Sequence, residues 1–385
     1  MVMALISTRI ARIFADFTEG AGGGIRGLKY VATLVSLILL AGACAGPTPA
    51  AVAPILPPPS LETISAATVT PAPPTLTPLP SPTSVPTIEP TATIPPTPDP
   101  YAGLTIADLA GRAYGGGELQ VVETLAVTGA FTRTLIAYPS DGLTVYGFMN
   151  VPFGEGPFPV VIAVHGYINP AAYTTLDYTT RYADALARAG YLVLHPNLRN
   201  YAPSDTGPNP FRAGYAVDVL NLAALAREQG GRPGPLAAAD AGAVGLWGHS
   251  MGGGISIRAM TVSPDVRAVA LYGAMSGDEQ ANYDRILIWS GGSDGPEELA
   301  TPPEDLERIS PIYHLERVQA AVSIHHGEAD GTVPVIWSLD LCERLKALGK
   351  TAECYTYPGQ PHTFVGDGDQ LFMARVQAFF DAWLR

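Results

Sequence analysis

The sequence is poor in cysteine and in positive charge. It has three cysteines among 385 residues, and its 22 Lys and Arg stand against 35 Asp and Glu, which gives a formal net charge of -13. A nucleic-acid surface needs clustered Lys and Arg, and we find no such cluster. We therefore expect no nucleic-acid partner, and we interpret the acidity as an aid to solubility.

The apolar segment near the N-terminus is too short to span a membrane. YVATLVSLILLAGAC, which ends at Cys44, offers about thirteen uncharged residues, too few for a helix to cross a bilayer. Basic residues precede it, and Ala41-Gly42-Ala43 fits signal cleavage. Leu40–Cys44 also resembles a bacterial lipobox, so Cys44 is either lipidated and tethered to a membrane or free in a secreted chain. We expect residues 1–44 to be a signal peptide of an exported protein.

A segment rich in Pro and Thr follows, from 45 to 100. It has almost no charge and little apolar surface to bury, so we expect an extended, unpacked stalk. The remaining residues, 101–385, are enough for one domain with a substantial core.

Export also favours a disulfide between Cys342, in an expected helix, and Cys354, in the strand expected next; two buried free thiols are the alternative.

Apolar runs alternate with helical patterns throughout residues 101–385. Two strand-like segments flank the hairpin signal Asp141-Gly142. Further strands are expected at 159–165, 191–195, 243–248, 266–272, 320–326 and 352–357, and helices at 175–189, 213–229, 251–262, 333–348 and 369–384. This alternation predicts an α/β fold with a mostly parallel central sheet and helices on both faces, entered through an antiparallel hairpin.

The motif Gly248-His-Ser-Met-Gly252 places Ser250 between an expected strand and an expected helix. This is the context of the G-x-S-x-G nucleophile elbow, where glycines leave room for a sharp turn and the hydroxyl stands above the sheet. A glycine-rich turn can also exist for packing alone. Because strand, turn and helix agree here, we predict that Ser250 is a nucleophile.

A serine nucleophile needs a base and a carboxylate to orient that base. Asp330 and His362 each follow an expected strand, and the chain order Ser, Asp, His is that of α/β hydrolases. Asp330 has a simpler alternative role, capping the helix expected near Val333. Asp367 and Asp369 come after the histidine, on the wrong side for this order.

The remaining site residues follow from the chemistry of acyl transfer. The oxyanion of the transition state needs donors already in place, and we predict the backbone N–H groups of Met251 and Tyr167. His249 is expected to pack in the elbow, and His325 and His326 to point to opposite faces of a strand, which disfavours a metal pair. No metal or organic cofactor is required by this chemistry.

The motifs together resemble the catalytic domain of the prolyl oligopeptidase family of serine peptidases, within the α/β-hydrolase superfamily. The resemblance spans roughly 131–385 and rests on HGY at 165, GHSMGG at 248, SPIYHLERV at 310, HGEADGTVP at 326 and GQPHTF at 359. It implies a Ser250, Asp330, His362 triad that cleaves peptide or acyl-peptide bonds. Two features depart from it. HGY is similar to carbohydrate acetyl esterases of the same superfamily, and the segment 101–130 is too short for the family's β-propeller.

We therefore expect an exported serine hydrolase that acts on a peptide or a small-molecule ester through an acyl-enzyme intermediate. A peptidase is the first interpretation, with a carboxylesterase or carbohydrate acetyl esterase as the alternative. A non-catalytic binding protein on the same fold is a third, since fold does not dictate function. Residues 276–310 separate two strands by more than an ordinary loop and are a candidate cap over the nucleophile or a surface excursion. Roles in substrate binding for Arg199 and Tyr201, in a nearby loop, stay open, and so does the oligomeric state.

Overall fold

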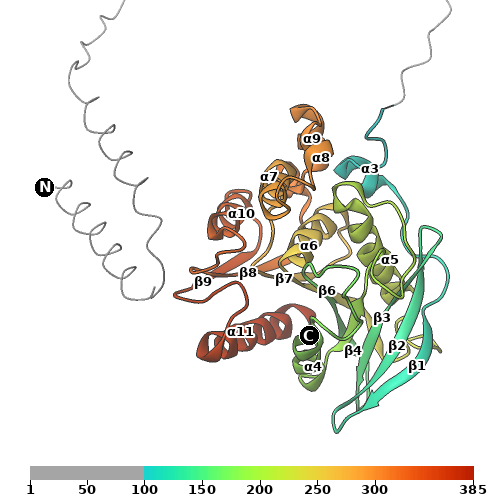
Figure 1. Ribbon diagram of the computed structural model, residues 1–385. Coiled ribbons are helices and arrows are strands. Elements are labelled where there is room, and N and C mark those ends of the chain that lie inside the picture. The colour runs from blue at the N-terminus through green and yellow to red at the C-terminus, as the bar shows by residue number, and fades with distance from the viewer. Residues whose placement is uncertain (1–98) are drawn as a thin grey trace, which may run out of the picture. The chain divides into compact units, whose positions relative to one another are not determined.

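Residues 99–385 are the part of the chain that this computed structural model describes (Figure 1). The predicted signal peptide with Cys44, and nearly all of the predicted stalk, lie outside these residues. Within them, no helix combines the length and the apolar character needed to cross a bilayer.

The described residues contain a nine-stranded sheet in the order β1-β2-β3-β5-β4-β6-β7-β8-β9. Its strands are β1 Gln120–Val127, β2 Phe131–Ser140, β3 Leu143–Pro152, β4 Phe158–Val164, β5 Leu192–Pro196, β6 Ala239–His249, β7 Ala268–Tyr272, β8 Ala321–Gly327 and β9 Ala352–Tyr357. The first three strands pair antiparallel, and β3 also pairs antiparallel with β5. The six strands β4 to β9 all run parallel to one another. The predicted hairpin is confirmed, because Ser140 pairs with Leu143 across Asp141 and Gly142.

Helices cover both faces of the sheet, as the alternation predicts. They are α3 Ile106–Gly111, α4 Thr180–Arg188, α5 Ala213–Gln229, α6 Met251–Val262, α7 Glu279–Trp289, α8 Pro296–Leu299, α9 Pro303–Ile309, α10 Val335–Ala347 and α11 Gly366–Leu384, with short 3-10 turns at Pro210–Arg212, Pro311–Tyr313 and Leu315–Arg317. Figure 1 shows α4 and α11 on one side of the sheet and α5 and α6 on the other.

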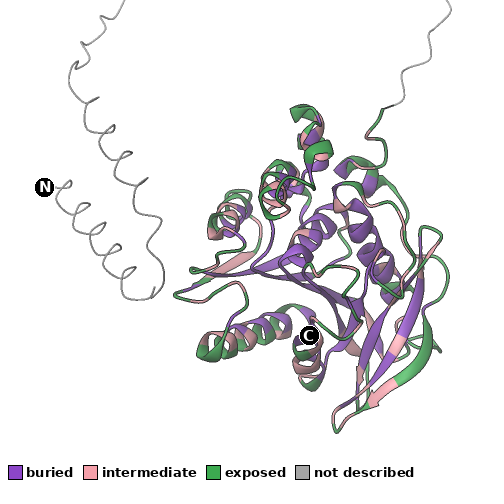
Figure 2. Ribbon diagram, viewed as in Figure 1, coloured by how far each residue is buried: buried purple, intermediate pink, exposed green. Residues whose placement is uncertain are grey.

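The central strands are apolar on both faces because each face is covered by helices. In β4, Ile162 packs in the core cluster that contains α5 and α6, whereas Val161 and Ala163 pack in the cluster that contains α4 and α11. Figure 2 shows these strands buried and the outer surfaces of the helices exposed. The fold class is thus the predicted one, an α/β-hydrolase fold.

Two parts of the structure were not expected from the sequence in detail. The edge strand β1 is one, and the segment 276–310 is the other, since it forms the three helices α7, α8 and α9. Near the far edge of the sheet, Cys342 in α10 and Cys354 in β9 form a disulfide.

Candidate active site

Ser250 occupies the sharp turn between β6 and α6. Its backbone has φ 56° and ψ -119°, a positive φ that is strained for a residue with a side chain. The turn is held from both directions. The Ser250 N–H donates to the Tyr272 carbonyl over 2.9 Å, and the Ser250 carbonyl accepts from Met275 N–H over 3.0 Å.

The glycines of the motif are required by close packing at this turn. A β-carbon at Gly248 would overlap the Gly252 carbonyl oxygen and lie 2.5 Å from Ser256 Oγ. A β-carbon at Gly252 would overlap the carbonyl oxygen of Val164, at the end of the neighbouring β4. Side chains at either position would therefore push the elbow away from the sheet.

Asp330 lies in the loop after β8, and its two carboxylate oxygens have different partners. Oδ2 accepts from His362 Nδ1 over 2.6 Å, while Oδ1 accepts from the N–H groups of Thr332 and Val333 at 2.8 and 2.9 Å. Asp330 thus orients the histidine and also holds the turn before α10, but it does not cap that helix, which begins at Val335 with Pro334 as its N-cap. Burial acts to raise the pKa of Asp330, but hydrogen bonds from His326, His362 and Val333 outweigh it and hold that pKa well below its usual range.

His362 lies in the loop after β9, next to the Asp330 loop that follows β8. When Nδ1–H of the neutral ring donates to Asp330, the other ring nitrogen, Nε2, carries the lone pair. Its backbone carbonyl accepts from His249 Nε2 over 3.0 Å, and the two imidazole rings lie 4.7 Å apart. The ring of His362 is mostly buried, so its position is defined by these contacts.

Ser250 and His362 line a common cavity of about 530 Å³. That volume lies in the range of small-molecule sites. Among residues 99–385 no hydrogen bond joins the Ser250 hydroxyl to the His362 ring, whereas the ring is bonded to Asp330. Contacts of this kind are often long without a substrate and tighten when one binds.

Both predicted oxyanion donors also belong to residues of this cavity wall. Met251 is the first residue of α6, so its N–H has no acceptor within the helix. Tyr167 lies in the loop that follows β4, and its side chain is exposed. The structure therefore places Met251 and Tyr167 around the cavity that Ser250 lines.

The segment 276–310 contributes one wall of the cavity through α7. Tyr283, Ile286 and Trp289 line it from this helix. On the same helix, Arg285 donates to the carbonyl oxygens of Gly331 at 2.9 Å and Thr332 at 3.0 Å, next to Asp330. These hydrogen bonds hold α7 against the loop that carries Asp330.

Two histidines contribute to the site in ways that sequence reasoning missed. His326 Nε2 lies 3.1 Å from Asp330 Oδ2, and its Nδ1 lies 2.7 Å from Ser338 Oγ in α10. His249 is buried, as expected of a packed residue, but it also contacts the His362 backbone. For His249, the one indication in the sequence of a role in the site is its position directly before Ser250. For His326, nothing in the nearby sequence indicates its contact with Asp330.

His325 points away from His326, as predicted. Its ring stacks on Tyr355, at 5.2 Å between ring centroids, and lies edge-on to Phe372 of α11 at 5.0 Å. The competing acid Asp369 forms an ion pair with Arg181.

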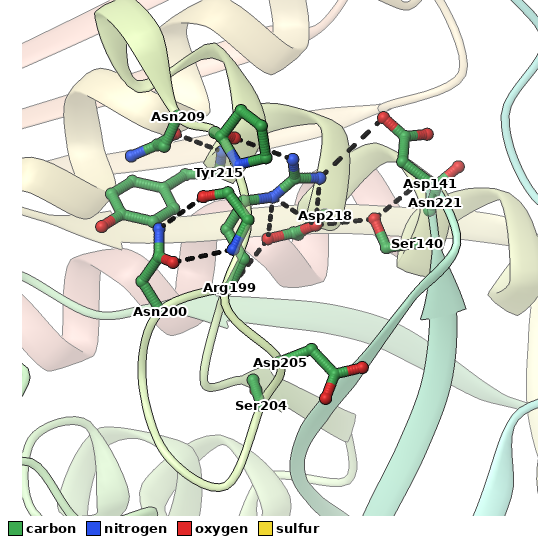
Figure 3. Close-up of polar contacts among 12 residues, drawn as sticks. Ser140, Asp141, Arg199, Asn200, Ser204, Asp205, Asn209, Tyr215, Asp218 and Asn221 are labelled. Carbon is green, nitrogen blue, oxygen red and sulfur yellow. Dashed lines mark hydrogen bonds and ion pairs between the residues drawn. The ribbon is translucent and has the colours of Figure 1, made fainter.

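Arg199 and Tyr201, left open as substrate contacts, lie in the protein interior. Figure 3 shows the Arg199 guanidinium directed at the carboxylate of Asp218 in α5, to which it donates at 2.8 and 3.1 Å. Asp218 also accepts from Ser140 Oγ over 2.6 Å. This buried network holds the loop after β5 against α5, so Arg199 has a structural role.

Comparison with known proteins gives two family matches. The model of the prolyl oligopeptidase family matches residues 236–385, and that of the alpha/beta hydrolase fold matches residues 159–292. A Synechocystis protein assigned as a carboxymethylenebutenolidase is 23% identical over 265 residues, which cover 65% of this chain and 92% of that protein.

Two solved structures show the same fold. A puromycin-hydrolyzing peptidase of Mycobacterium tuberculosis has a TM-score of 0.51 and 22% identity over 67% of this chain, and this chain spans 40% of that peptidase. Acetyl xylan esterase 1 from Thermoanaerobacterium has a TM-score of 0.52 and 17% identity over 69% of this chain and 88% of the esterase. Identities this low establish the fold alone.

The family matches and the fold together define an α/β hydrolase. The chain has an α/β-hydrolase fold, and its residues 236–385 are similar to the prolyl oligopeptidase family. The protein is a serine hydrolase.

Proposed function

We propose that this protein is an exported serine esterase that hydrolyses small esters with Ser250, His362 and Asp330. The observation that carries the proposal is the 2.6 Å hydrogen bond between His362 and Asp330 at the cavity that Ser250 lines. An imidazole oriented in this way is the base that a serine hydroxyl needs at neutral pH.

In the first half of the reaction, His362 Nε2 accepts the proton of Ser250 as Oγ attacks the ester carbonyl carbon. The carbonyl oxygen becomes an oxyanion, and the N–H groups of Met251 and Tyr167 donate to it. The imidazolium, stabilised by Asp330, then gives its proton to the departing alkoxide as the carbon–oxygen bond breaks. An alcohol leaves, and the acyl group stays on Ser250.

In the second half, water replaces the alcohol. His362 accepts a proton from water, whose oxygen attacks the acyl carbonyl carbon, and the same two N–H groups bind the oxyanion. The proton returns to Ser250 Oγ as the acyl bond breaks, so the acid is released and the enzyme is regenerated. No other reactant is needed.

A small ester fits the cavity wall better than a long peptide does. Aromatic and aliphatic side chains dominate the lining: Tyr167, Tyr178, Tyr215, Tyr283, Trp289, Met251, Met275 and Ile286. Such a wall suits a compact apolar acyl or alcohol group. A relative that this chain spans over most of its length, assigned as a carboxymethylenebutenolidase, also supports an ester.

A peptidase is the second candidate, and the prolyl oligopeptidase match favours it. That match covers 236–385, which includes Ser250, Asp330 and His362. The same acyl-enzyme chemistry cleaves an amide if the leaving amine is protonated by His362. Peptide and ester cleavage therefore differ in the leaving group and in the binding of the rest of the substrate.

Export stays part of the proposal. It is supported by the leader sequence that ends near Cys44 and by the disulfide between Cys342 and Cys354, a bond typical of oxidising compartments. Lipid attachment at Cys44 would add a membrane tether. Metabolic labelling with an alkyne fatty acid, compared between wild type and Cys44→Ser, tests the tether.

The function is tested by steady-state kinetics of the whole protein. We expect hydrolysis of 4-nitrophenyl butyrate by the wild type and a loss of kcat of about 10⁴-fold or more in Ser250→Ala. Equal activity in that variant, with unchanged thermal unfolding, contradicts the proposal. Faster turnover of aminoacyl 4-nitroanilides than of 4-nitrophenyl esters would favour the peptidase.

A further inference from the structure

A positive charge lies in the wall of this largely apolar cavity. Among the described residues that line it, Arg212 is the one Lys or Arg. It is the last residue of the 3-10 turn Pro210–Arg212 and lies directly before α5. A cation beside apolar side chains is unfavourable unless it has a partner, so its surroundings are informative.

The backbone that carries Arg212 is strained and firmly held. Phe211 and Arg212 have φ values of 50° and 56°, although neither is a glycine. Strain of this kind persists where the surrounding structure enforces it, and it is common at binding sites. Here the loop is held at one end by the Arg199–Asp218 pair (Figure 3) and at the other by Asn209 Oδ1, which accepts from Tyr215 N–H over 3.1 Å.

Two arginines share one carboxylate at this wall. Glu279, at the start of α7, accepts from Arg258 Nη2 over 2.7 Å and from Arg212 Nη2. Arg258 is fully buried and also donates to the carbonyls of Ile309 and Phe211, at 2.8 and 3.3 Å. Burial lowers the pKa of Arg258, and the neighbouring charge of Arg212 adds to that effect while Glu279 opposes it. Both arginines thus donate to the same carboxylate, and the charge of Glu298 also acts on Arg212.

Arg212 retains donors that the protein does not use. Among the described residues its side-chain hydrogen bond is that of Nη2 to Glu279, and a guanidinium has N–H groups on all three nitrogens. The ring of Tyr283 lies 4.8 Å from the guanidinium carbon and restrains the plane of the group. Asp294 lines the cavity too, but it is exposed, its Oδ1 accepts from Ser293 Oγ, and no ion pair joins it to Arg212 within residues 99–385.

We propose that Arg212 binds a carboxylate of the substrate, so that the enzyme prefers esters that carry a second, anionic group. This rests on the proposed function, because it names the substrate class of the same cavity. A planar guanidinium with unused donors matches a carboxylate in shape and charge. The ligand carboxylate then accepts from the N–H groups of Arg212 that the bond to Glu279 leaves unused. The competing role for Arg212 is purely structural, joining the loop after β5 to α7 through Glu279.

Ligand binding to the Ser250→Ala protein tests the proposal without requiring hydrolysis. The probes are glutaric acid monoanilide and its methyl ester, which differ in the charge of the terminal group, with binding measured by calorimetry. We expect the acid to bind about 10- to 100-fold more tightly than the methyl ester, the range of a charge-assisted hydrogen bond. Equal or weaker binding of the acid overturns the proposal, whatever the enzyme hydrolyses.

Substitutions assign the preference to Arg212. Arg212→Gln should remove most of the ratio between acid and methyl ester, and Arg212→Lys should keep part of it. Arg232→Gln, at an exposed arginine outside the cavity lining, is the matched control and should keep the ratio. A ratio unchanged in folded Arg212→Gln overturns the proposal. If the acid binds as expected but no ester is turned over by the wild type, the anion site stands and the esterase fails.

Discussion

His249 donates from Nε2 to the backbone carbonyl of His362, 3.0 Å away. Its other ring nitrogen, Nδ1, therefore accepts from the hydroxyl of Tyr178, a cavity residue, over 2.7 Å. Burial lowers the pKa of His249 to about 3, so the ring is neutral and keeps this one tautomer at neutral pH. A neutral histidine thus links the cavity wall to the loop that carries the proposed base.

Removing this link should slow the chemical step more than it weakens substrate binding. We expect His249→Phe, which keeps a flat ring and loses both hydrogen bonds, to lower kcat for 4-nitrophenyl butyrate by about 10- to 100-fold, since small misplacements of a base are costly. Tyr178→Phe, which removes one of the two bonds, should have a smaller effect. An unchanged kcat in His249→Phe, or a change in KM alone, would show that His249 only fills space.

Asp330 should act mainly through the orientation and charge of His362. Asp330→Asn keeps an oxygen for the N–H groups of Thr332 and Val333 but removes the negative charge, and we expect kcat to fall by about 10³- to 10⁴-fold. Asp369→Asn, which breaks a surface pair with Arg181, is the control and should retain activity. Comparable kcat values for the two variants would remove Asp330 from the mechanism.

The positions of the three proposed catalytic residues could be predicted from the sequence. Ser250, Asp330 and His362 each follow a strand of a parallel sheet, so their meeting at one edge follows from the alternation of strands and helices. The contacts of His249 and His326 could not be predicted, because they depend on side-chain directions and on loops brought together from distant parts of the chain.

The strand β1 escaped prediction for a different reason. It is mostly exposed at the sheet edge, with Val121 and Val122 at 44% and 50% exposure, and two irregularities interrupt its pairing with β2. It therefore lacks the apolar alternation that marks a half-buried strand. For Arg199, a role in substrate binding was left open because it lies in a loop after a strand. Its partner Asp218 is buried in α5, and the sequence does not indicate that pair.

Acid should destabilise the protein through its buried neutral histidines. Burial lowers the pKa values of His249 and His325 to about 3, below the ordinary value of 6.5. Between these values the unfolded chain binds more protons, so the free energy of unfolding falls as the pH falls. At pH 5 the loss is about 2 kcal/mol for each of the two.

Urea unfolding at pH 7.5, 6 and 5 measures this loss. Replacing His325 by Gln should make the decline with pH shallower, while His314→Gln, at a partly exposed histidine, is the control. A free energy of unfolding that is constant from pH 7.5 to 5 would contradict the prediction.

The disulfide should stabilise the C-terminal part of the domain. Cys342 and Cys354 are 12 residues apart, and closing a short loop of this kind contributes about 3 kcal/mol in the chain-entropy account. We expect the Cys342→Ser, Cys354→Ser double variant to have a lower Tm, and the wild type in reductant to approach it. Equal Tm values for the oxidised wild type and the variant would argue against the bond.

The account is tested most directly by intact-mass spectrometry of the acyl-enzyme. The substrate is 4-nitrophenyl trimethylacetate, because its bulky acyl group should leave the acyl-enzyme slowly. Protein quenched with acid during turnover should therefore carry one added trimethylacetyl group, located by peptide mapping on Ser250. Ser250→Ala should gain no such mass. Steady turnover of this ester by the wild type with no acyl group on Ser250, or with the group on another residue, would contradict the proposed mechanism.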